Sequence, residues 1–323
     1  MKPNAWVSSS QATELLAKQL ATWPLAEANY KALEKVQIKS FDMGGFTIRV
    51  QYNPSRIVSS AAKTDATSIQ ERKCFLCPDN LPAEQERLPF GANYLVLSNP
   101  YPIFPQHFTI PSREHTPQSI QCRFLDFLEL ARRLDDFTVF YNGPECGASA
   151  PDHAHFQAGT RSFMPMDDEL DAYPIKFTRL LHEEKDGTLF LLSGYLRNGF
   201  IIKAATLNAA QSLFEKIYSN LEIKPNETEP RMNLFAHYEK GIWTIIIIPR
   251  RQHRPWQYKA EGEQHLLSSP GAADIGGLFI TPLKKDFDKI NADLLCDVFS
   301  QVCFNDKEIE TIAFNIAQQT NNR

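Results

Sequence analysis

The chain has 323 residues, with 34 lysines and arginines against 38 aspartates and glutamates, for a formal net charge of −4. This balance gives no positive field for a nucleic-acid backbone, so we expect no polynucleotide partner. No apolar run approaches the roughly 18 residues needed to span a bilayer, and the start, Met-Lys-Pro-Asn-Ala-Trp, lacks the apolar core of a signal peptide. We therefore expect a soluble, cytoplasmic protein without a membrane partner.

The cysteines are too sparse for a disulfide scaffold in a chain of this length. Only one pair has a chemically suggestive spacing, Cys-x-x-Cys at Cys74 and Cys77. This spacing favours metal binding over a disulfide. The six cysteines are Cys74, Cys77, Cys122, Cys146, Cys296 and Cys303.

The first elements along the chain are helical. Leucines recur at helical spacing through residues 11–36, Ser8 to Ser10 offer N-caps, and Trp23-Pro24 divides the stretch, so we predict two helices. Apolar side chains then alternate from Phe46 to Tyr52, which predicts a half-buried strand.

A mixed order of strands and helix follows. Apolar runs predict strands at residues 94–97 and 107–110, and helical periodicity predicts a helix over 124–134. Two further strands are predicted at 138–141 and 154–158. This order is typical of an α+β fold with a mostly antiparallel sheet.

The second half of the chain resembles the first. The strings Ile110–Pro117 and Ile248–Pro255 share five of eight positions, and each follows an apolar strand, so we predict a duplicated half-domain. In the second half we predict a helix over 209–221, closing helices from residue 284, and strands at 189–192, 200–202, 232–238, 243–248 and 278–280.

The strongest local signal lies between Asn142 and Gln157. On a strand, residues two apart share a face at steps of about 6.5–7 Å, so three polar side chains would project together: His153, His155 and Gln157. The turn ahead of them contains Gly143, Gly147 and Ser149, whose N–H groups and hydroxyl could hold phosphate oxygens. The alternative is that these histidines simply face solvent.

The second signal is Cys74-Phe75-Leu76-Cys77. A Cys-x-x-Cys loop supplies two thiolates, which is half of a tetrahedral zinc site, and imidazoles commonly supply the rest. His115 and His153 are the candidates for these imidazoles. A redox dithiol or two buried cysteines are the alternatives for this motif.

These residues together resemble a known family. The run from Asn142 to Gln157 is similar to the active-site segment of the histidine-triad (HIT-like) superfamily, in the branch where glutamine replaces the last histidine. That branch contains galactose-1-phosphate uridylyltransferase, diadenosine tetraphosphate phosphorylase and the GDP-hexose phosphorylases. The Cys74–Cys77 loop with Asn80 resembles the zinc knuckle of the uridylyltransferase, and Asn99 to His115 resembles the central hairpin of the superfamily.

The resemblance implies specific roles. Structural zinc would be bound by Cys74, Cys77, His115 and His153. His155 would be the nucleophile, and its Nδ1–H would be held by a backbone carbonyl so that Nε2 faces phosphorus. Gln157 would bind a phosphate oxygen. The other substrate contacts would come from Arg56, Asn142, Gly143, Gly147 and Ser149.

The implied fold is a tandem of HIT-like half-domains. We expect N-terminal helices in residues 1–40, a catalytic half with the zinc knuckle in 41–165, and a degenerate second half in 166–323. The second half lacks a His-x-His, so uridylyl exchange is not favoured over a phosphorylase reaction. Its basic run from Arg250 to Arg254 could contact a phosphate or form a solvated turn.

The implied activity is a nucleotidyltransferase or phosphorylase that acts on a nucleoside diphosphate sugar or dinucleoside polyphosphate. Glutamine cannot act as a general acid, which favours a phosphate-type acceptor over water. A nucleotide hydrolase and an inactive zinc-stabilised scaffold are the alternatives. The sequence leaves the base, the acceptor and the oligomeric state open, with a homodimer among the options.

Overall fold

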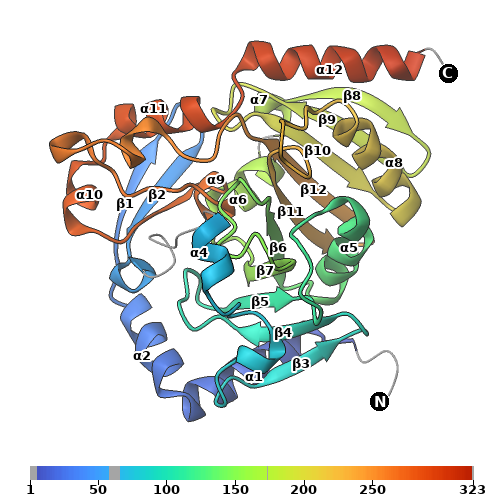
Figure 1. The fold of residues 1–323 in the computed structure, drawn as a ribbon. Helices are drawn as coiled ribbons and strands as arrows, with labels where there is room; N and C mark the ends of the chain where they lie inside the picture. The colour runs from blue at the N-terminus through green and yellow to red at the C-terminus, as the bar shows by residue number, and fades with distance from the viewer. Residues whose placement is uncertain (1–5, 58–65, 173, 322–323) are drawn as a thin grey trace.

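Ten strands form one continuous sheet that carries most of the molecule (Figure 1). The computed structural model describes residues 6–57, 66–172 and 174–321. All neighbouring strands of this sheet are antiparallel, which confirms the predicted α+β class. In spatial order the strands are β3 (Arg87–Phe90), β4 (Tyr94–Ser98), β5 (His107–Pro111), β7 (His155–Thr160), β6 (Phe137–Asn142), β11 (Met232–Glu239), β12 (Ile242–Pro249), β10 (Gly199–Ala204), β9 (Gly187–Leu192) and β8 (Thr178–Glu184).

The strand order contains a duplication. Read from its two outer edges, the sheet runs β3-β4-β5-β7-β6 on one side and β8-β9-β10-β12-β11 on the other. Each side has one helix between its third and fourth strands along the chain, α5 (Phe124–Arg133) in the first half and α8 (Leu207–Tyr218) in the second. The two halves meet where β6 pairs with β11. The tandem arrangement expected from the sequence is therefore present.

The sequence string that suggested this repeat does not mark equivalent places. The segment Ile110–Pro117 leaves the sheet after β5, whereas Ile248–Pro255 leaves it after β12. The counterpart of β12 in the first half is β7 and not β5. The two segments look alike because a proline, which lacks an N–H, ends each strand, so the alignment is corrected while the duplication stands.

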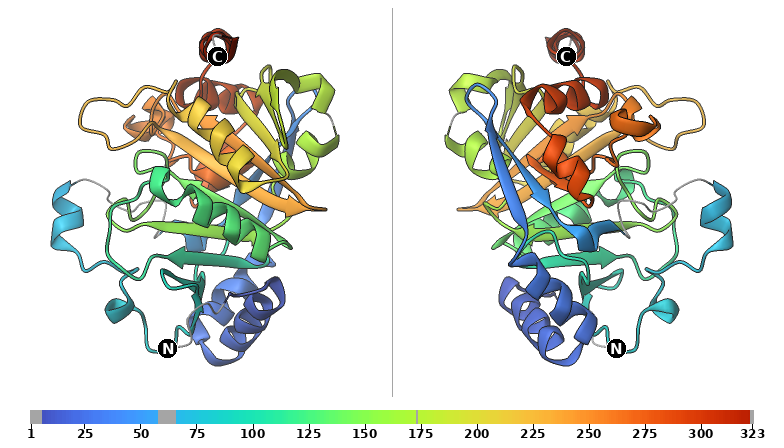
Figure 2. Two further views of the ribbon diagram at one scale, coloured as in Figure 1. Left: turned by 90° about the vertical axis from the view of Figure 1, so that its right-hand side faces the viewer. Right: turned by 90° about the vertical axis from the view of Figure 1, so that its left-hand side faces the viewer.

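Different layers cover the two faces of the sheet. One face packs against α5 and α8, where the rings of Phe124 and Phe214 stack with centroids 3.9 Å apart. The other face packs against a three-stranded sheet, in which β2 (Thr47–Tyr52) lies between β1 (Gln37–Asp42) and β13 (Leu278–Thr281). The opposite views of Figure 2 place these layers in front in turn. β13 belongs to the second half and pairs in parallel with β2. The second half therefore completes a sheet that begins near the N-terminus.

The predicted helices are present, including the division at Trp23-Pro24. The N-terminal pair is α1 (Ser9–Thr22), which Ser8 caps, and α2 (Pro24–Leu33). Among the described residues, no helix is long and apolar enough to cross a membrane. The remaining helices are α4 (Ala66–Glu71), α6 (Pro165–Ala172), α7 (Pro174–Phe177), α9 (Ala272–Ile275), α10 (Lys284–Lys289), α11 (Ala292–Val302) and α12 (Asp306–Asn321).

Three strands were missed from the sequence, each for a physical reason. β1 is exposed along most of its length, so it carries no alternating apolar pattern. β3 is four residues long and contains a proline. β8 is an edge strand with a register shift between Leu180 and His182, which breaks the period of two.

Candidate active site

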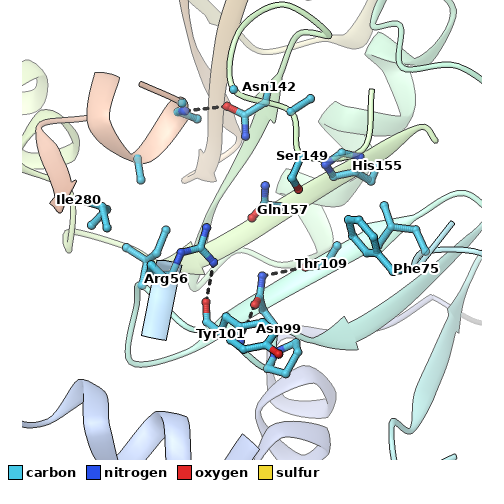
Figure 3. A pocket seen from close by; sticks show the side chains of 18 of the residues that line it. Arg56, Phe75, Asn99, Tyr101, Thr109, Asn142, Ser149, His155, Gln157 and Ile280 are labelled. Carbon is cyan, nitrogen blue, oxygen red and sulfur yellow. Dashed lines mark hydrogen bonds between the residues drawn. The ribbon is translucent and has the colours of Figure 1, made fainter. Parts of the chain in front are cut away.

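A cavity of about 450 Å³ lies on the face of the large sheet that also packs against β13. β6 and β7 contribute Phe140, His155 and Gln157, and the end of β2 leads to Arg56. The second half contributes residues 253–254, Leu267, Ser269, residues 271–274 and Ile280. The cavity therefore lies between the two halves of the duplication, and Figure 3 shows part of its lining.

His155 is fixed at the first position of β7. Its side chain is 5 % exposed, and its Nδ1 lies 2.8 Å from the carbonyl oxygen of His153. A carbonyl only accepts, so Nδ1 carries the proton and Nε2 is the unprotonated nitrogen. Burial lowers the pKa of His155 to about 4, so the ring is neutral at pH 7. The ring lines the cavity in the tautomer that a nucleophilic imidazole needs.

A buried glutamine ties this strand to its neighbour. Gln118 accepts a hydrogen bond from the N–H of His155 at 2.8 Å and donates to the carbonyls of His155 and Asn142 at 3.0 and 2.9 Å. These bonds join β7 to the end of β6, where the two strands diverge around the glycine-rich loop. Gln118 therefore helps to fix the backbone that carries the imidazole.

Gln157 is oriented by a second histidine, His107 on β5. His107 Nδ1 accepts the N–H of Ile103 at 3.2 Å, so Nε2 carries the proton and donates to Gln157 Oε1 at 3.0 Å. Burial, together with the charge of Arg56, lowers the pKa of His107 to about 3, which keeps it neutral. With Oε1 engaged, the amide group of Gln157 presents its N–H donors to the cavity.

Arg56 supplies a positive charge to the cavity. It ends a short 3₁₀ turn after β2, and its Nη1 donates to the carbonyl of Tyr101 at 2.7 Å (Figure 3). Burial lowers its pKa to about 10, which leaves the guanidinium charged at pH 7. Its buried Nε has no hydrogen-bond partner among the described residues.

The glycine-rich loop is shaped by packing against the second half. A Cβ on Gly143 would lie 2.9 Å from the carbonyl oxygen of Met232, and a Cβ on Gly147, whose φ is +96°, would lie 2.5 Å from Gly271 Cα. The N–H of Gly143 donates to that same Met232 carbonyl, and Gly143 does not line the cavity. Gly143 therefore packs against the second half away from the cavity, whereas Gly147 borders the cavity.

Asn142 and Ser149 also line the cavity, in different ways. Asn142 Oδ1 accepts the N–H of Ala272 at 2.7 Å and Nδ2 of Asn233 at 2.9 Å, so its carbonyl oxygen braces the two halves (Figure 3). Ser149 has its backbone carbonyl held by Arg72 at 3.2 Å, and it lines the same cavity as His155 (Figure 3).

Four side chains that could hold a metal ion lie together, as the sequence predicted. Their donor atoms all lie within 4.8 Å of one another: Cys74, Cys77, His115 and His153. Thiol sulfur and imidazole Nδ1 are 3.3 Å apart for Cys74 with His153 and 3.2 Å apart for Cys77 with His115. Tetrahedral zinc with ordinary bond lengths separates S and N by about 3.5 Å, so the four residues fit such an ion.

Polar groups on the Nε2 side of each ring orient the two histidines of this cluster. His153 Nε2 donates to the carbonyl of Ser112 at 2.8 Å, and His115 Nε2 lies 3.6 Å from a carboxylate oxygen of Asp152. Each ring thus directs Nδ1 towards the thiols, as metal-binding histidines commonly do. Because His153 O also accepts from His155, the cluster and the candidate nucleophile share one residue.

Sequence reasoning missed three residues that organise this site. Gln118, His107 and Arg72 act through partners 24 to 80 positions away, so no local pattern reveals them. Arg72 donates both to the Ser149 carbonyl and to Asp152. The string Arg250 to Arg254 was also misjudged in part, because Arg250 is 2 % exposed and bonded to Asn233 and to backbone carbonyls.

Comparison with solved structures finds the same fold in yeast Ap4A phosphorylase Apa2. The TM-score is 0.58 at 15 % identity, over 91 % of this chain and 97 % of that chain. Its complex with Ap4A gives 0.57 at 15 % identity over 93 % and 99 %, and its complex with AMP gives 0.54 at 16 % over 90 % and 97 %. At this identity the likeness shows a shared fold.

Comparison with known sequences finds one matching family model. Residues 15–160 match a family described as a domain of unknown function, DUF4922. No curated protein matches the chain.

Proposed function

We propose that the protein is a nucleotidyltransferase of the phosphorylase type, with His155 as a covalent nucleophile. The observation that carries the proposal is the neutral imidazole whose Nδ1–H is fixed on a carbonyl and whose ring borders the cavity. Neutral imidazole is an effective nucleophile near pH 7, and its covalent adduct divides one transfer into two easier steps.

In the first step His155 Nε2 forms a bond with the α-phosphorus of a nucleotide. The bond from that phosphorus to the bridging oxygen breaks, and the leaving phosphate-bearing group takes the electron pair. In the second step an oxygen of a phosphate-type acceptor attacks the same phosphorus, and the N–P bond breaks, which restores neutral His155. No proton donor is needed when both groups are already anionic, which agrees with a glutamine at position 157.

Charge on the phosphoryl oxygens needs fixed donors. The Gln157 amide, the Ser149 hydroxyl, the Gly147 backbone and the Arg56 guanidinium border the same cavity. Preorganised donors of this kind commonly contribute about 10²- to 10³-fold each to the rate. Arg56, with its buried Nε unpartnered among the described residues, suits a polyanionic substrate.

The similar structures support a nucleotide as substrate. The yeast phosphorylase of the same fold is described in complex with AMP and with Ap4A. We therefore infer a dinucleoside polyphosphate or a nucleoside diphosphate sugar as donor for this chain.

We infer that the cluster of Cys74, Cys77, His115 and His153 binds one zinc ion. Two thiolates and two imidazoles complete a tetrahedron, so the ion would brace the loop against β7 and bind no substrate. The donor chemistry of the four side chains, with both rings oriented from behind, supports this assignment.

A phosphate-dependence screen tests the proposed reaction. Nucleoside diphosphate sugars and dinucleoside polyphosphates are incubated with the protein, with and without inorganic phosphate or a sugar phosphate. We expect consumption of at least one donor only when an acceptor is present. Equal consumption with and without acceptor would instead establish the hydrolase, and no consumption with any donor would favour the inactive scaffold.

A further inference from the structure

The wall of the cavity opposite the catalytic strand carries its own cluster of polar side chains. Three of its members come from the loops after β12, namely His253, Arg254 and Ser269. Arg254 Nε donates to Ser269 Oγ at 2.9 Å, and His253 Nε2 lies 3.1 Å from the same oxygen. Because the Glu145 carboxylate accepts from His253 Nδ1, His253 Nε2 accepts from the Ser269 hydroxyl. The charged guanidinium of Arg254 is therefore the group of this cluster that can attract an anion.

The cluster is held in place from behind. The guanidinium of Arg254 lies over the ring of Tyr258, 4.2 Å from its centroid. His253 Nδ1 lies 3.3 Å from a carboxylate oxygen of Glu145, which belongs to the glycine-rich loop of the first half. The side chains are thus fixed before any ligand arrives, which reduces the entropy lost on binding.

The two walls of the cavity differ in chemistry. The first half lines it with aromatic and apolar side chains, among them Trp23, Phe75 and Tyr101, which suit a nucleobase. Among the described lining residues, no phenylalanine, tyrosine or tryptophan comes from the second half, and the cationic side chain from that half is Arg254. Asp274 also lines this wall, but its carboxylate accepts the backbone N–H groups of Gly271 and Ile280.

The cluster is continuous with the catalytic loop. Gly147 packs so closely on Gly271 that a Cβ would not fit, which brings the loop carrying Ser149 against the turn that follows Ser269. An extended polyphosphate that touches Ser149 and His155 can therefore continue towards Arg254. Both groups border the same cavity of about 450 Å³.

We propose that His253, Arg254 and Ser269 form the second phosphate subsite. This subsite holds the leaving phosphate-bearing group in the first step and the acceptor in the second. The inference rests on the proposed function for the identity of that group. Its chemistry is a phosphate dianion, either free or as the monoester of a sugar. The second half thus selects the acceptor, while the first half binds the nucleotide and performs the chemistry.

Binding of phosphate compounds to Arg254 variants tests this subsite. Inorganic phosphate and, in a separate arm, glucose 1-phosphate are titrated by calorimetry into the full-length protein in the presence of a nucleoside monophosphate. Arg254→Gln should weaken the binding of whichever ligand the wild type binds by at least about tenfold, because a charge-assisted hydrogen bond is lost. Arg254→Lys keeps the charge and should retain most of the affinity.

Arg251→Gln is the matched control. Arg251 lies three positions earlier, pairs with Glu308 on α12 and does not line the cavity, so this variant should bind phosphate as the wild type does. Equal affinity in Arg254→Gln and wild type, or no binding of either ligand by the wild type, would overturn the subsite. An unfolding transition measured on each variant separates loss of binding from loss of folding.

Covalent labelling with an α-labelled nucleotide, run on the same proteins, separates this inference from the proposed function. A label on wild-type His155 with phosphate binding that ignores Arg254 retains the function and overturns the subsite. Phosphate binding that depends on Arg254 without any label retains the subsite and removes the covalent mechanism.

Discussion

The two halves of this molecule share one strand order but differ in what they place on the same face of the sheet. Gln157 pairs with Phe140, Phe140 with Phe235, and Phe235 with Ile246, and directly paired residues share a face. Where β7 presents His155 and Gln157, β12 presents Ile246 and Ile248. Duplication thus built a symmetric sheet, and only one copy carries the candidate catalytic groups.

The difference has an energetic side. Buried polar side chains must be hydrogen-bonded, and here His155 and the partly buried Gln157 on β7 each have a partner, as does His153 just ahead of the strand. β12 instead buries isoleucines, each of which stabilises the fold by about 1.5–3 kcal/mol. One half is suited to chemistry and the other to stability, and the polar side chains that the second half adds to the cavity all follow β12 along the chain.

The largest expected difference between the two halves comes from removing the amide donor of Gln157 on β7. Gln157→Leu should lower kcat by about 10²- to 10³-fold, and the His107 N–H left without its acceptor should lower the unfolding free energy by about 1–3 kcal/mol. The matched variant on the other half, Ile246→Val, should leave kcat within about twofold and lower stability by about 1 kcal/mol. Steady-state kinetics and urea unfolding measure both, and a similar loss of kcat in the two variants would contradict the division of labour.

Kinetic measurements on a His107 variant can test whether this residue positions Gln157. His107→Phe keeps an aromatic ring against Phe104 and Phe140 but removes the N–H that orients Gln157. We expect kcat to fall at least about tenfold, and the fall to be much smaller in the Gln157→Leu background, because the two residues act as one unit. Additive losses in this double-mutant cycle would show that His107 acts only through packing.

Metal analysis tests whether a bound ion stabilises the first half. One zinc ion per chain is expected, and Cys74→Ser should lower the unfolding free energy by more than about 2 kcal/mol, because an ion that binds only the folded chain stabilises it. Cys122→Ser, at an exposed free cysteine outside the cluster, is the control and should change little. Protein purified without chelator that contains no stoichiometric metal would remove the assignment.

The basic run of the second half offers a smaller test. Arg250→Gln should destabilise the protein by about 3 kcal/mol, since Asn233 Oδ1 and the Val302 and Pro270 carbonyls lose a buried charged donor. Arg251→Gln should cost less than about 1 kcal/mol because its pair with Glu308 is partly exposed to solvent, which screens the interaction. Thermal or urea unfolding of both variants decides, and equal stability would place Arg250 outside the core.

The smallest expected effect is a pH dependence at the junction between the halves. Glu229 accepts from Tyr141 Oη at 2.6 Å and from the N–H of Ile120 at 2.8 Å, and burial raises its pKa to about 7. A carboxyl whose pKa is raised in the folded state contributes stability below its ordinary pKa, and this is lost as pH rises towards 7.

Glu229→Gln removes that titration but also one acceptor. The variant should therefore be less stable than wild type at pH 4.5, by roughly 1–3 kcal/mol, and the gap should narrow by pH 8. Urea unfolding at several pH values measures the gap. A gap that is constant with pH would show that Glu229 ionises normally in the folded protein.

The sequence predicted the site better than it predicted the surroundings of the site. The Cys-x-x-Cys loop and the alternating residues His153 and His155 were visible because spacing along one segment fixes their geometry. His115 was a candidate because imidazoles commonly complete a zinc site that begins with Cys-x-x-Cys, and the structure brings the four cluster residues together. Gln118 and His107 were invisible as site residues because their partners lie far along the chain. Which basic residue of the second half faces the cavity also depended on how the loop after β12 folds back.

The repeat in the fold could also be predicted only in part from the sequence. A duplicated half-domain could be predicted because each half has its own strands and helix, yet the string Ile110–Pro117 pointed to the wrong counterpart. Edge strands such as β8 lack a buried face, so their sequence carries no alternation to detect. Only the pairing of β6 with β11 shows how the two copies join.

The central claim, that His155 forms a covalent nucleotidyl intermediate, is tested most directly by an α-labelled nucleotide donor. The wild type, mixed with donor and no acceptor, should acquire an acid-labile, base-stable label on His155 that phosphate discharges. His155→Gly should lose the label and transfer while its nucleotide affinity stays within about tenfold, since the nucleophile acts mainly in the transition state. His265→Gln, outside the cavity, should label normally. Full activity in His155→Gly, or donor consumption by the wild type without any label, would contradict the account.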